Sequence, residues 1–304
     1  MQYETEKFSA KKEDAAAEHT KLPTMKNGHK KAGNTRGFRS ILTGFLLLTG
    51  MILAAAGYLP VYLQNRRADT EKERFLDISL EQDETGEPEN GRETEGGSDQ
   101  EKEKRKNTQQ DPLQRRFDFA GLKEINREIV GWIYVPGTQI DYPVCRGADD
   151  SYYLTHSAEK EESVLGAVFV PPETGETLGE AHVLFYGHNM RSGRMFGELS
   201  SYCEKTFREK YPEVYVYTPG FSCRSVVYSV YRTDHDGPAY TIGYSFETEA
   251  YRRWQEETAE QSLYDCGYMP DSGQQVFTLS TCTDSGAATD RLVVHCAVTE
   301  RRDT

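Results

Sequence analysis

The chain has 304 residues, with 36 Lys and Arg against 49 Asp and Glu, and its formal net charge is −13. Length alone permits roughly two domains. The net acidity, with no basic cluster beyond a short membrane-proximal region, argues against nucleic acid as a partner, because neutralising phosphates requires a Lys and Arg face.

An uncharged segment follows a cationic N-terminus. Residues 1–40 carry nine Lys or Arg against five Asp or Glu, and we expect a disordered tail. Residues 41–63 contain no charge and as a helix would be about 34 Å long, just beyond the roughly 30 Å of a hydrocarbon layer. Because the cations cluster on the N-terminal side, we predict a single-pass signal anchor in the cell membrane with a cytoplasmic N-terminus.

A cleaved signal peptide is the alternative for this segment. Its apolar stretch would be 41–53, and Ala54-Ala55-Ala56 would be the processing site. The apolar run continues through Leu63, which favours the uncleaved anchor. Both interpretations place residues 68–304 outside the cell.

The next segment is strongly acidic. Residues 68–111 carry seven Lys or Arg against fifteen Asp or Glu, and Phe75 and Ile78 are exceptions in a composition that is otherwise poor in aromatic and apolar β-branched residues. Such a segment buries too little apolar surface to offset the entropy cost of ordering. We therefore expect 64–111 to be an acidic disordered linker that tethers an extracellular catalytic domain, 112–304.

The remaining chain reads as mainly β with accessory helices. Apolar residues recur at helical spacing over Leu113–Ile129, which predicts an N-terminal helix. Eight short apolar or alternating runs, separated by turn signals, then predict strands in an antiparallel or mixed barrel. These runs are Trp132–Val135, Ile140–Val144, Val164–Val170, His182–Tyr186, Val214–Tyr217, Ser225–Thr233, Val276–Thr281 and Leu292–Val298.

One long segment interrupts the strands. Phe246–Tyr264 reads as an amphipathic helix whose apolar face would include Ala250, Trp254 and Leu263. An insertion of that length between strands usually shapes a site.

The six cysteines offer little support for a metal site. None forms a Cys-x-x-Cys pair, so a structural zinc is poorly supported and we expect no metal and no cofactor. Disulfides are permitted outside the cell, although a catalytic thiol would leave the other five unable all to pair. Four cysteines are interpreted as small buried hydrophobes. These are Cys145, Cys203, Cys223 and Cys296.

Cys282 differs because it ends a strand-like run and precedes a polar loop, where a thiol is accessible. Nucleophilic use of a thiol requires a nearby base or cation that favours the thiolate. His188 follows the run His182–Tyr186, and Arg291 begins the run after the loop, so both are candidates. The alternative makes His188 a surface loop residue and Arg291 a solvated charge.

Four other histidines are rivals for the base. His182 and His295 lie inside strand runs and suit the core, whereas His156 and His235 lie in polar loops. The order of His before Cys, without a Gly-Ser-Cys-Trp context, disfavours a papain-type peptidase.

Several strings in 113–299 are specific enough to identify a resemblance. They are Ile-Asn-Arg-Glu-Ile-Val-Gly-Trp-Ile (125–133), Gly-Thr-Gln-Ile-Asp-Tyr-Pro-Val (137–144), Tyr-Gly-His-Asn-Met (186–190), Met-Phe-Gly (195–197), Thr-Leu-Ser-Thr-Cys (278–282) and Arg-Leu-Val-Val (291–294). With them the chain resembles the class B sortases, membrane-anchored cysteine transpeptidases of Gram-positive bacteria. The resemblance implies an eight-stranded barrel with an N-terminal helix and a helix inserted before the Cys strand.

The resemblance also implies roles for individual residues. Cys282 would be the nucleophile, His188 the proton donor and acceptor, and Arg291 the third catalytic residue, with the backbone N–H of Thr283 helping to bind the oxyanion. The implied substrate contacts are Leu154, Tyr240, Ile242, Ser280 and Thr281.

The implied reaction cleaves a C-terminal sorting signal of Pro-x-Thr type on surface proteins at its Thr, and transfers the acyl group to an amine of the peptidoglycan precursor. A surface cysteine peptidase that releases its product to water, a sortase-type pilin polymerase and a non-catalytic interaction protein on the same barrel are the alternatives. Acceleration by an added amine would separate transpeptidation from hydrolysis, and an unreactive Cys282 thiol would favour the non-catalytic protein.

Overall fold

The computed structural model describes residues 51, 58–60, 62–78, 111–282 and 290–304. The chain divides into two compact units, Met1–Gly57 and Tyr58–Thr304. The predicted tail, most of the predicted anchor 41–63 and residues 79–110 lie outside the described residues. Within the described part of the chain, no helix is both long enough and apolar enough to cross a bilayer.

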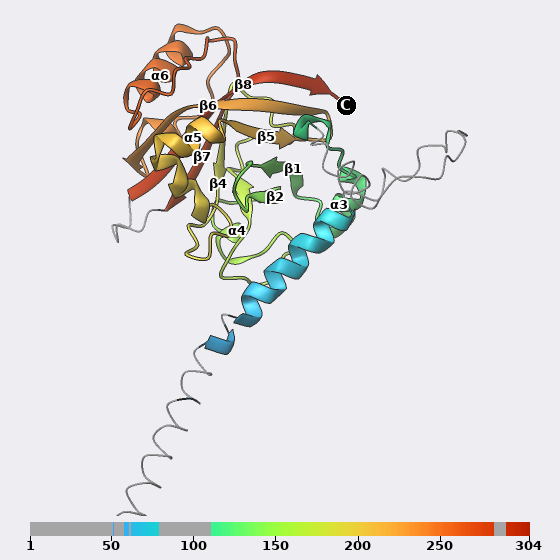
Figure 1. Cartoon of the computed structure of the whole chain (residues 1–304). Coiled ribbons are helices and arrows are strands. Elements are labelled where there is room, and N and C mark those ends of the chain that lie inside the picture. The colour runs from blue at the N-terminus through green and yellow to red at the C-terminus, as the bar shows by residue number, and fades with distance from the viewer. Residues whose placement is uncertain (1–50, 52–57, 61, 79–110, 283–289) are drawn as a thin grey trace, which may run out of the picture. The chain divides into compact units, whose positions relative to one another are not determined.

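The second unit is built on a closed barrel whose described strands follow the order β1-β2-β3-β4-β7-β8-β6-β5 (Figure 1). Two neighbouring pairs are parallel, β2 with β3 and β4 with β7, and the others are antiparallel. The strands are β1 (Ile129–Tyr134), β2 (Asp141–Arg146), β3 (Val168–Val170), β4 (His182–Tyr186), β5 (Glu213–Tyr217), β6 (Phe221–Asp234), β7 (Val276–Cys282) and β8 (Asp290–Asp303). The predicted mainly β fold with an eight-stranded barrel is confirmed.

Every second side chain along the strands points into the barrel and fills it. Successive side chains point to opposite faces of a strand, so Val183 and Phe185 of β4 and Phe277 and Leu279 of β7 join one buried apolar cluster. The residues between them, such as Thr278, lie on the other face. The sheet therefore has a second, outward face that must be covered by other elements.

The helices are short and lie around the barrel. They are η2 (Pro112–Gln114), α3 (Phe119–Ile125), α4 (Tyr152–Thr155), η3 (Gly197–Cys203), α5 (Lys205–Lys210), η4 (Pro238–Tyr240) and α6 (Glu249–Glu260). The N-terminal helix predicted over Leu113–Ile129 is much shorter, because Asp118 caps its start, Asn126 adopts an extended conformation at its end and β1 begins at Ile129.

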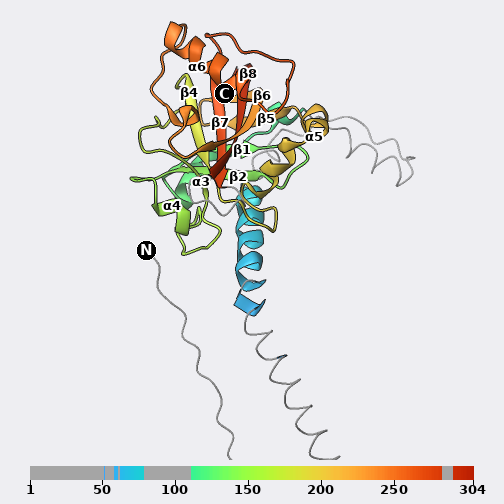
Figure 2. The same cartoon turned by 90° about the vertical axis from the view of Figure 1, so that its left-hand side faces the viewer.

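The predicted inserted helix exists as α6, but its buried face differs from the prediction. Trp254 is buried as expected, whereas Ala250 and Leu263 are exposed. Tyr251, Gln255 and Thr258 complete the buried face instead. Both Trp254 and Gln255 lie three or four residues from Tyr251 and from Thr258, which is the spacing of one helix face. Figure 2 shows α6 at the end of the barrel opposite the helix that precedes α3 in the chain.

That preceding helix, formed by residues 62–78, corrects the predicted linker. The prediction that 64–111 is disordered is wrong for 64–78, which is helical and docks on the barrel with Phe75 only 1% exposed. Phe75 joins an apolar cluster with Trp132 and Tyr153. The catalytic unit therefore begins before residue 112, and part of its core comes from a segment with an acidic composition.

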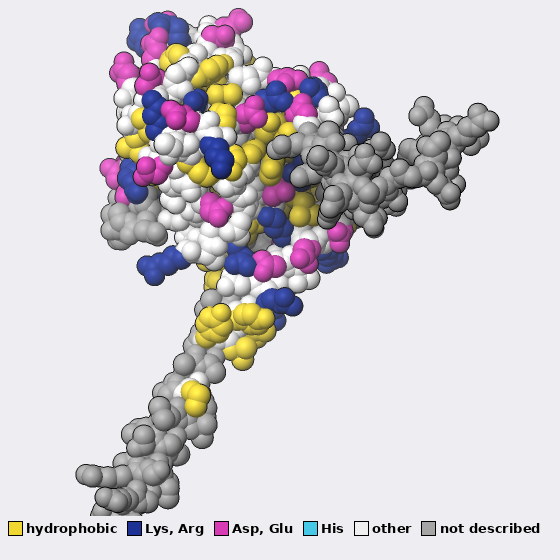
Figure 3. Space-filling view, in the orientation of Figure 1, with side chains coloured by type: hydrophobic (Ala, Val, Ile, Leu, Met, Phe, Trp, Pro, Cys, Tyr) yellow, Lys and Arg dark blue, Asp and Glu magenta, His cyan; other side chains and the backbone are white. Residues whose placement is uncertain are grey.

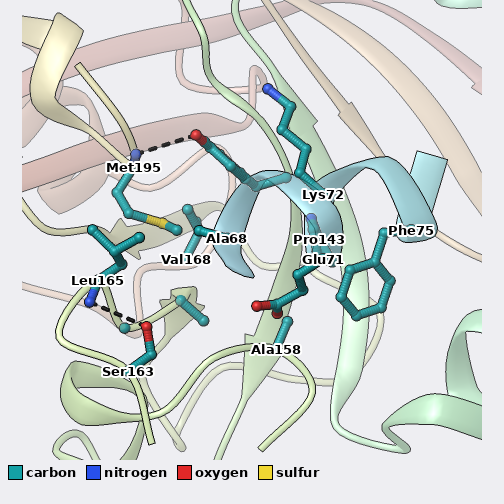
Figure 4. A pocket seen from close by; sticks show the side chains of 13 residues that line it. Ala68, Glu71, Lys72, Phe75, Pro143, Ala158, Ser163, Leu165, Val168 and Met195 are labelled. Atoms are coloured by element: carbon teal, nitrogen blue, oxygen red, sulfur yellow. Dashed lines mark hydrogen bonds between the residues drawn. The ribbon is translucent and has the colours of Figure 1, made fainter. Parts of the chain in front are cut away.

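Polar contacts hold the same helix in place. Arg194 donates to both carboxylate oxygens of Asp69 at 2.7 and 2.8 Å, and Lys72 Nζ donates to the Gln139 carbonyl at 2.7 Å. Figure 4 shows Glu71 and Phe75 turned toward a small cavity between this helix and the barrel. Beyond the docked part, apolar side chains gather on the exposed portion of the helix (Figure 3).

Candidate active site

Three strand ends meet at one edge of the barrel. Strands β4 and β7 run parallel with Tyr186 opposite Ser280, so both strands end at the same edge. Strand β8 begins there, because it pairs antiparallel with β7 and places Arg291 opposite Cys282. Opposed residues in such a pair have Cα atoms about 4.5–5.5 Å apart. The predicted adjacency of Cys282 and Arg291 therefore holds for the backbone.

His188 belongs to the same edge. The chain turns just after β4, where the Gly187 N–H donates to the Ser280 carbonyl at 3.2 Å. His188 follows directly, two residues beyond the Tyr186–Ser280 pair. The fold thus places His188 at the same barrel edge as Cys282 and Arg291, although more than ninety positions separate it from them in the sequence. The side chain of Cys282, and Thr283 with the loop 283–289, lie outside the described residues.

The His188 ring is held in one orientation. Its Nε2–H donates to the Leu154 carbonyl of α4 at 2.7 Å, and a carbonyl oxygen can only accept. When the imidazole is neutral, Nδ1 therefore carries the lone pair. Fixing one ring nitrogen in this way leaves the other free for proton transfer.

Gly166 makes this arrangement possible, and sequence reasoning did not identify it. Its φ is +59°, and a Cβ at this position would clash with the Tyr153 carbonyl and lie 3.0 Å from Cδ2 of His188. Glycine alone adopts that φ without penalty and leaves room for both groups. A turn formed by 163–166 therefore replaces the first part of the predicted strand Val164–Val170.

Arg291 is half-buried near a tyrosine pair. Its Nη1 donates to the Asp290 carbonyl at 3.0 Å. Burial raises the pKa of Tyr186, the neighbouring Tyr240 adds to the rise, and the Arg291 cation opposes it. The Arg291 cation therefore lies close enough to interact electrostatically with Tyr186 at the end of β4.

A wall of polar and aromatic groups borders the same edge. The Tyr240 and Ser280 hydroxyls lie 2.6 Å apart, and the ring of Tyr240 stacks on Tyr186 with 6.3 Å between centroids. Of the predicted substrate contacts, Leu154 is 41% exposed, while Tyr240 and Ile242 are half-buried. All three retain surface for a ligand.

Ser280 and Thr281 are placed differently from the other predicted contacts. They are 1% and 3% exposed. The Ser280 hydroxyl contacts that of Tyr240. The Thr281 hydroxyl has no hydrogen-bond partner within the described part of the chain. Their role as direct substrate contacts stays a prediction.

The rival histidines lie elsewhere. His182 and His295 are buried and hydrogen-bonded in the sheet, as their sequence positions predicted. Burial lowers the pKa of His182 to about 4, so it is neutral at physiological pH. The His156 ring stacks on Tyr152 with 4.0 Å between centroids, and His235 is exposed. Only His188, among the histidines of 111–282 and 290–304, follows the β4 end.

The other cysteines fit the interpretation as packing residues. Cys145, Cys223 and Cys296 are fully buried, and Cys203 is half-buried against the barrel core. Together with Cys266 they are free thiols. Burial raises the pKa of Cys223 to about 12 and so suppresses its thiolate. Among the described residues, no group of three or more His, Cys, Asp or Glu side chains could hold a metal ion.

Comparison with known proteins gives a consistent result. The family model described as "Sortase domain" matches residues 133–299. Sortase B of Listeria monocytogenes is 30% identical over 182 residues, which cover 59% of this chain and 73% of that protein. Sortase B of Staphylococcus aureus is 28% identical over 180 residues, with the same coverage of 59% and 73%.

Solved structures agree with these relatives. A sortase B–substrate complex from Staphylococcus aureus matches with a TM-score of 0.55 and 28% identity, covering 60% of this chain and 84% of that one. Sortase B from Bacillus anthracis, in complex with AAEK1, matches with a TM-score of 0.55 and 32% identity, covering 61% and 85%.

Proposed function

We propose, because this chain belongs to the sortase family, that Cys282, His188 and Arg291 carry out its reaction. The chain is a class B sortase, a cysteine transpeptidase that acts on the C-terminal sorting signals of surface proteins. The observation that supports these roles is the pairing of Cys282 with Arg291 at the edge where His188 follows β4.

In the first half-reaction, the Cys282 thiolate attacks the carbonyl carbon of the signal's Thr and forms a C–S bond. The peptide C–N bond breaks as the departing amine takes a proton from Nδ1 of the His188 imidazolium. The Leu154 carbonyl engages Nε2–H, which leaves Nδ1 as the ring nitrogen that gives and takes the proton. The product is a thioester between the protein substrate and Cys282.

In the second half-reaction, neutral His188 accepts a proton from the incoming amine through Nδ1 while that amine attacks the thioester. The C–S bond breaks, and the thiolate and imidazolium are restored. The rate of the reaction therefore depends on the fraction of Cys282 and His188 pairs that are in the thiolate–imidazolium state.

Arg291 would act on the oxyanion rather than on the thiol. Its position opposite Cys282 lets a planar guanidinium donate directed hydrogen bonds to the carbonyl oxygen as negative charge develops there. The backbone N–H of Thr283 is the proposed second donor. Leu154, Tyr240 and Ile242 would bind the signal along the adjoining surface.

The setting of the reaction is part of the proposal. Sortases anchor proteins to the cell wall of Gram-positive bacteria. For this chain we propose a membrane anchor over 41–63, a cytoplasmic N-terminus, an extracellular catalytic unit and a peptidoglycan precursor amine as acceptor. The uncharged run over 41–63 and its cationic N-terminal flank support this topology.

The test uses a peptide with a Pro-x-Thr signal, with and without a glycine-type amine. Wild type should form a thioester detectable by mass spectrometry and consume the peptide faster when the amine is present. Cys282→Ala should lose both, whereas Cys203→Ala, which removes another partly accessible thiol, should retain them. Cleavage that the amine leaves unchanged would favour hydrolysis, and cleavage by Cys282→Ala would refute the assigned nucleophile.

A further inference from the structure

Four buried polar side chains form a continuous hydrogen-bonded chain on the outward face of the sheet. His182 on β4, Thr278 on β7, His295 on β8 and Tyr231 on β6 are each at most 3% exposed. Nε2 of His182 lies 2.7 Å from Oγ1 of Thr278, which lies 2.8 Å from Nδ1 of His295. Nε2 of His295 lies 3.1 Å from the Tyr231 hydroxyl.

A fifth group sets the direction of every hydrogen bond. Nδ1 of His182 lies 2.8 Å from the Thr241 carbonyl, which can only accept, so this nitrogen carries the proton. The Nε2 lone pair of neutral His182 then accepts from the Thr278 hydroxyl. The Thr278 oxygen in turn accepts from Nδ1–H of His295, and Nε2 of His295 accepts from Tyr231. Burial lowers the pKa of both imidazoles and keeps them neutral, and in that state the contacts place the ring proton of each on Nδ1.

The hydrogen-bonded chain ends at the wall of polar and aromatic groups beside the candidate active site. Thr241 lies between Tyr240 and Ile242, two of the proposed substrate contacts. The rest of this segment is also held: Nε1 of Trp254 on α6 donates to the Pro238 carbonyl at 2.8 Å. The Trp254 ring covers His182 with 4.2 Å between centroids. The Thr241 N–H donates back to the Pro238 carbonyl at 3.2 Å, whereas the Thr241 carbonyl accepts from His182 and is thereby tied to the sheet.

We propose that His182 is a positioning residue for substrate recognition, which fixes the backbone at Thr241 and thereby the wall formed by Tyr240 and Ile242. This inference rests on the proposed function of that wall. His182 touches no reacting atom. It acts by anchoring a loop segment to the rigid sheet, and the three groups behind it orient its ring.

A purely structural role would not require this arrangement. Apolar side chains of similar volume would fill the same layer at least as favourably, because buried polar networks gain little net stability over well-packed hydrophobic groups. What a directed hydrogen-bond chain adds is a single orientation for its terminal partner. Here that partner is a backbone carbonyl between two proposed substrate contacts.

The test compares His182→Phe with His182→Gln in the full-length protein. Phe keeps a ring against Trp254 but removes the donor to the Thr241 carbonyl and one of the two partners of the Thr278 hydroxyl. The KM for the signal peptide should therefore rise about tenfold. The kcat should change less than threefold, and alkylation of Cys282 should be unaffected. Gln offers both a donor and an acceptor and should recover most of the affinity.

Two further variants separate recognition from folding. Thr278→Val interrupts the hydrogen-bonded chain at its centre with little change of side-chain volume, and it should raise KM in the same way as His182→Phe. Val183→Ala, which removes apolar volume from the opposite, interior face of β4, should lower Tm without changing KM. If His182→Phe does not fold, the Thr278 variant decides the question.

The proton arrangement has its own signature. In ¹⁵N spectra of histidine-labelled protein, His182 and His295 should both appear as neutral Nδ1–H tautomers. An unchanged KM in both chain variants, with active wild type, would overturn the positioning role. Failure of wild type to cleave the peptide would instead refute the proposed function, and the recognition role with it, while the spectra would still report on the chain.

Discussion

Glu71 provides the strongest prediction about stability, because it places a carboxyl group between the 62–78 helix and the barrel. Its Oε1 accepts from the Glu159 N–H at 3.3 Å. Burial raises the pKa of Glu71 to about 7 from an ordinary value of 4.5, and the charge of Glu159 adds to the rise. The protonated form is therefore the one that the docked helix favours.

The sign and size of the effect of pH on the free energy of unfolding follow from proton linkage. A carboxyl whose folded pKa is raised stabilises the fold fully below pH 4.5, and this contribution is lost as the pH rises toward 7. Each unit of difference in pKa corresponds to 1.36 kcal/mol, so the loss between pH 4.5 and pH 7 is at most about 3 kcal/mol. Above pH 7 the contribution should be constant.

Glu71→Gln should remove this dependence, because the amide has a similar shape and does not ionise. The free energy of unfolding would be measured in urea at pH 4 and pH 8, using Trp132, which packs in the same cluster as Phe75, as the fluorescent reporter. We expect equal stability of wild type and variant at pH 4, and a variant more stable by up to about 3 kcal/mol at pH 8.

Glu73→Gln is the matched control, because Glu73 is exposed on the same helix. Its effect should stay within about 0.5 kcal/mol at both pH values. If Glu71→Gln showed the same change between pH 4 and pH 8 as wild type, the carboxyl would not be the titrating group and the reasoning would fail.

Three other predictions concern the docked helix and the active site. A chain that begins at residue 112 should lose at least about 2 kcal/mol of stability relative to one that begins at 58, because it lacks the buried Phe75; equal urea midpoints would contradict this. Gly166→Ala should lower kcat sharply by displacing the His188 ring, while leaving the rate of Cys282 alkylation nearly unchanged; normal turnover would show that the turn adapts. Arg291→Lys should lose roughly 10²–10³ in kcat, because a point charge cannot copy directed donors, again with little change in alkylation. Equal losses in both measurements would assign Arg291 to thiolate activation instead.

Much of the fold was predictable because local patterns carry it. Alternation and turn residues located all eight strands, and β4 was predicted with its full extent, His182–Tyr186. The short loop between Cys282 and Arg291 implied adjacent strands, which the pairing of β7 with β8 confirms. The resemblance to the family came from short strings between residues 125 and 294, several of them at these strand ends.

The helix over 62–78 could not be found in the same way. Its docked face follows helical spacing through Ala68, Glu71, Lys72 and Phe75, but two of these four residues are charged. Composition therefore indicated a solvated segment. Only the barrel supplies the acceptor for Lys72 and the apolar cluster for Phe75.

The amino-acid sequence by itself determined which segments become strands and which side chains are chemically able to form the site. It did not determine their neighbours, because strand pairing joins residues that are far apart in the chain. That β4 lies parallel to β7 places His188 beside the Cys282 strand end and lets His182 reach Thr278. The burial of Ser280, the space at Gly166 and the bond to Thr241 exist only once the barrel has closed, since each depends on a contact between elements distant in sequence.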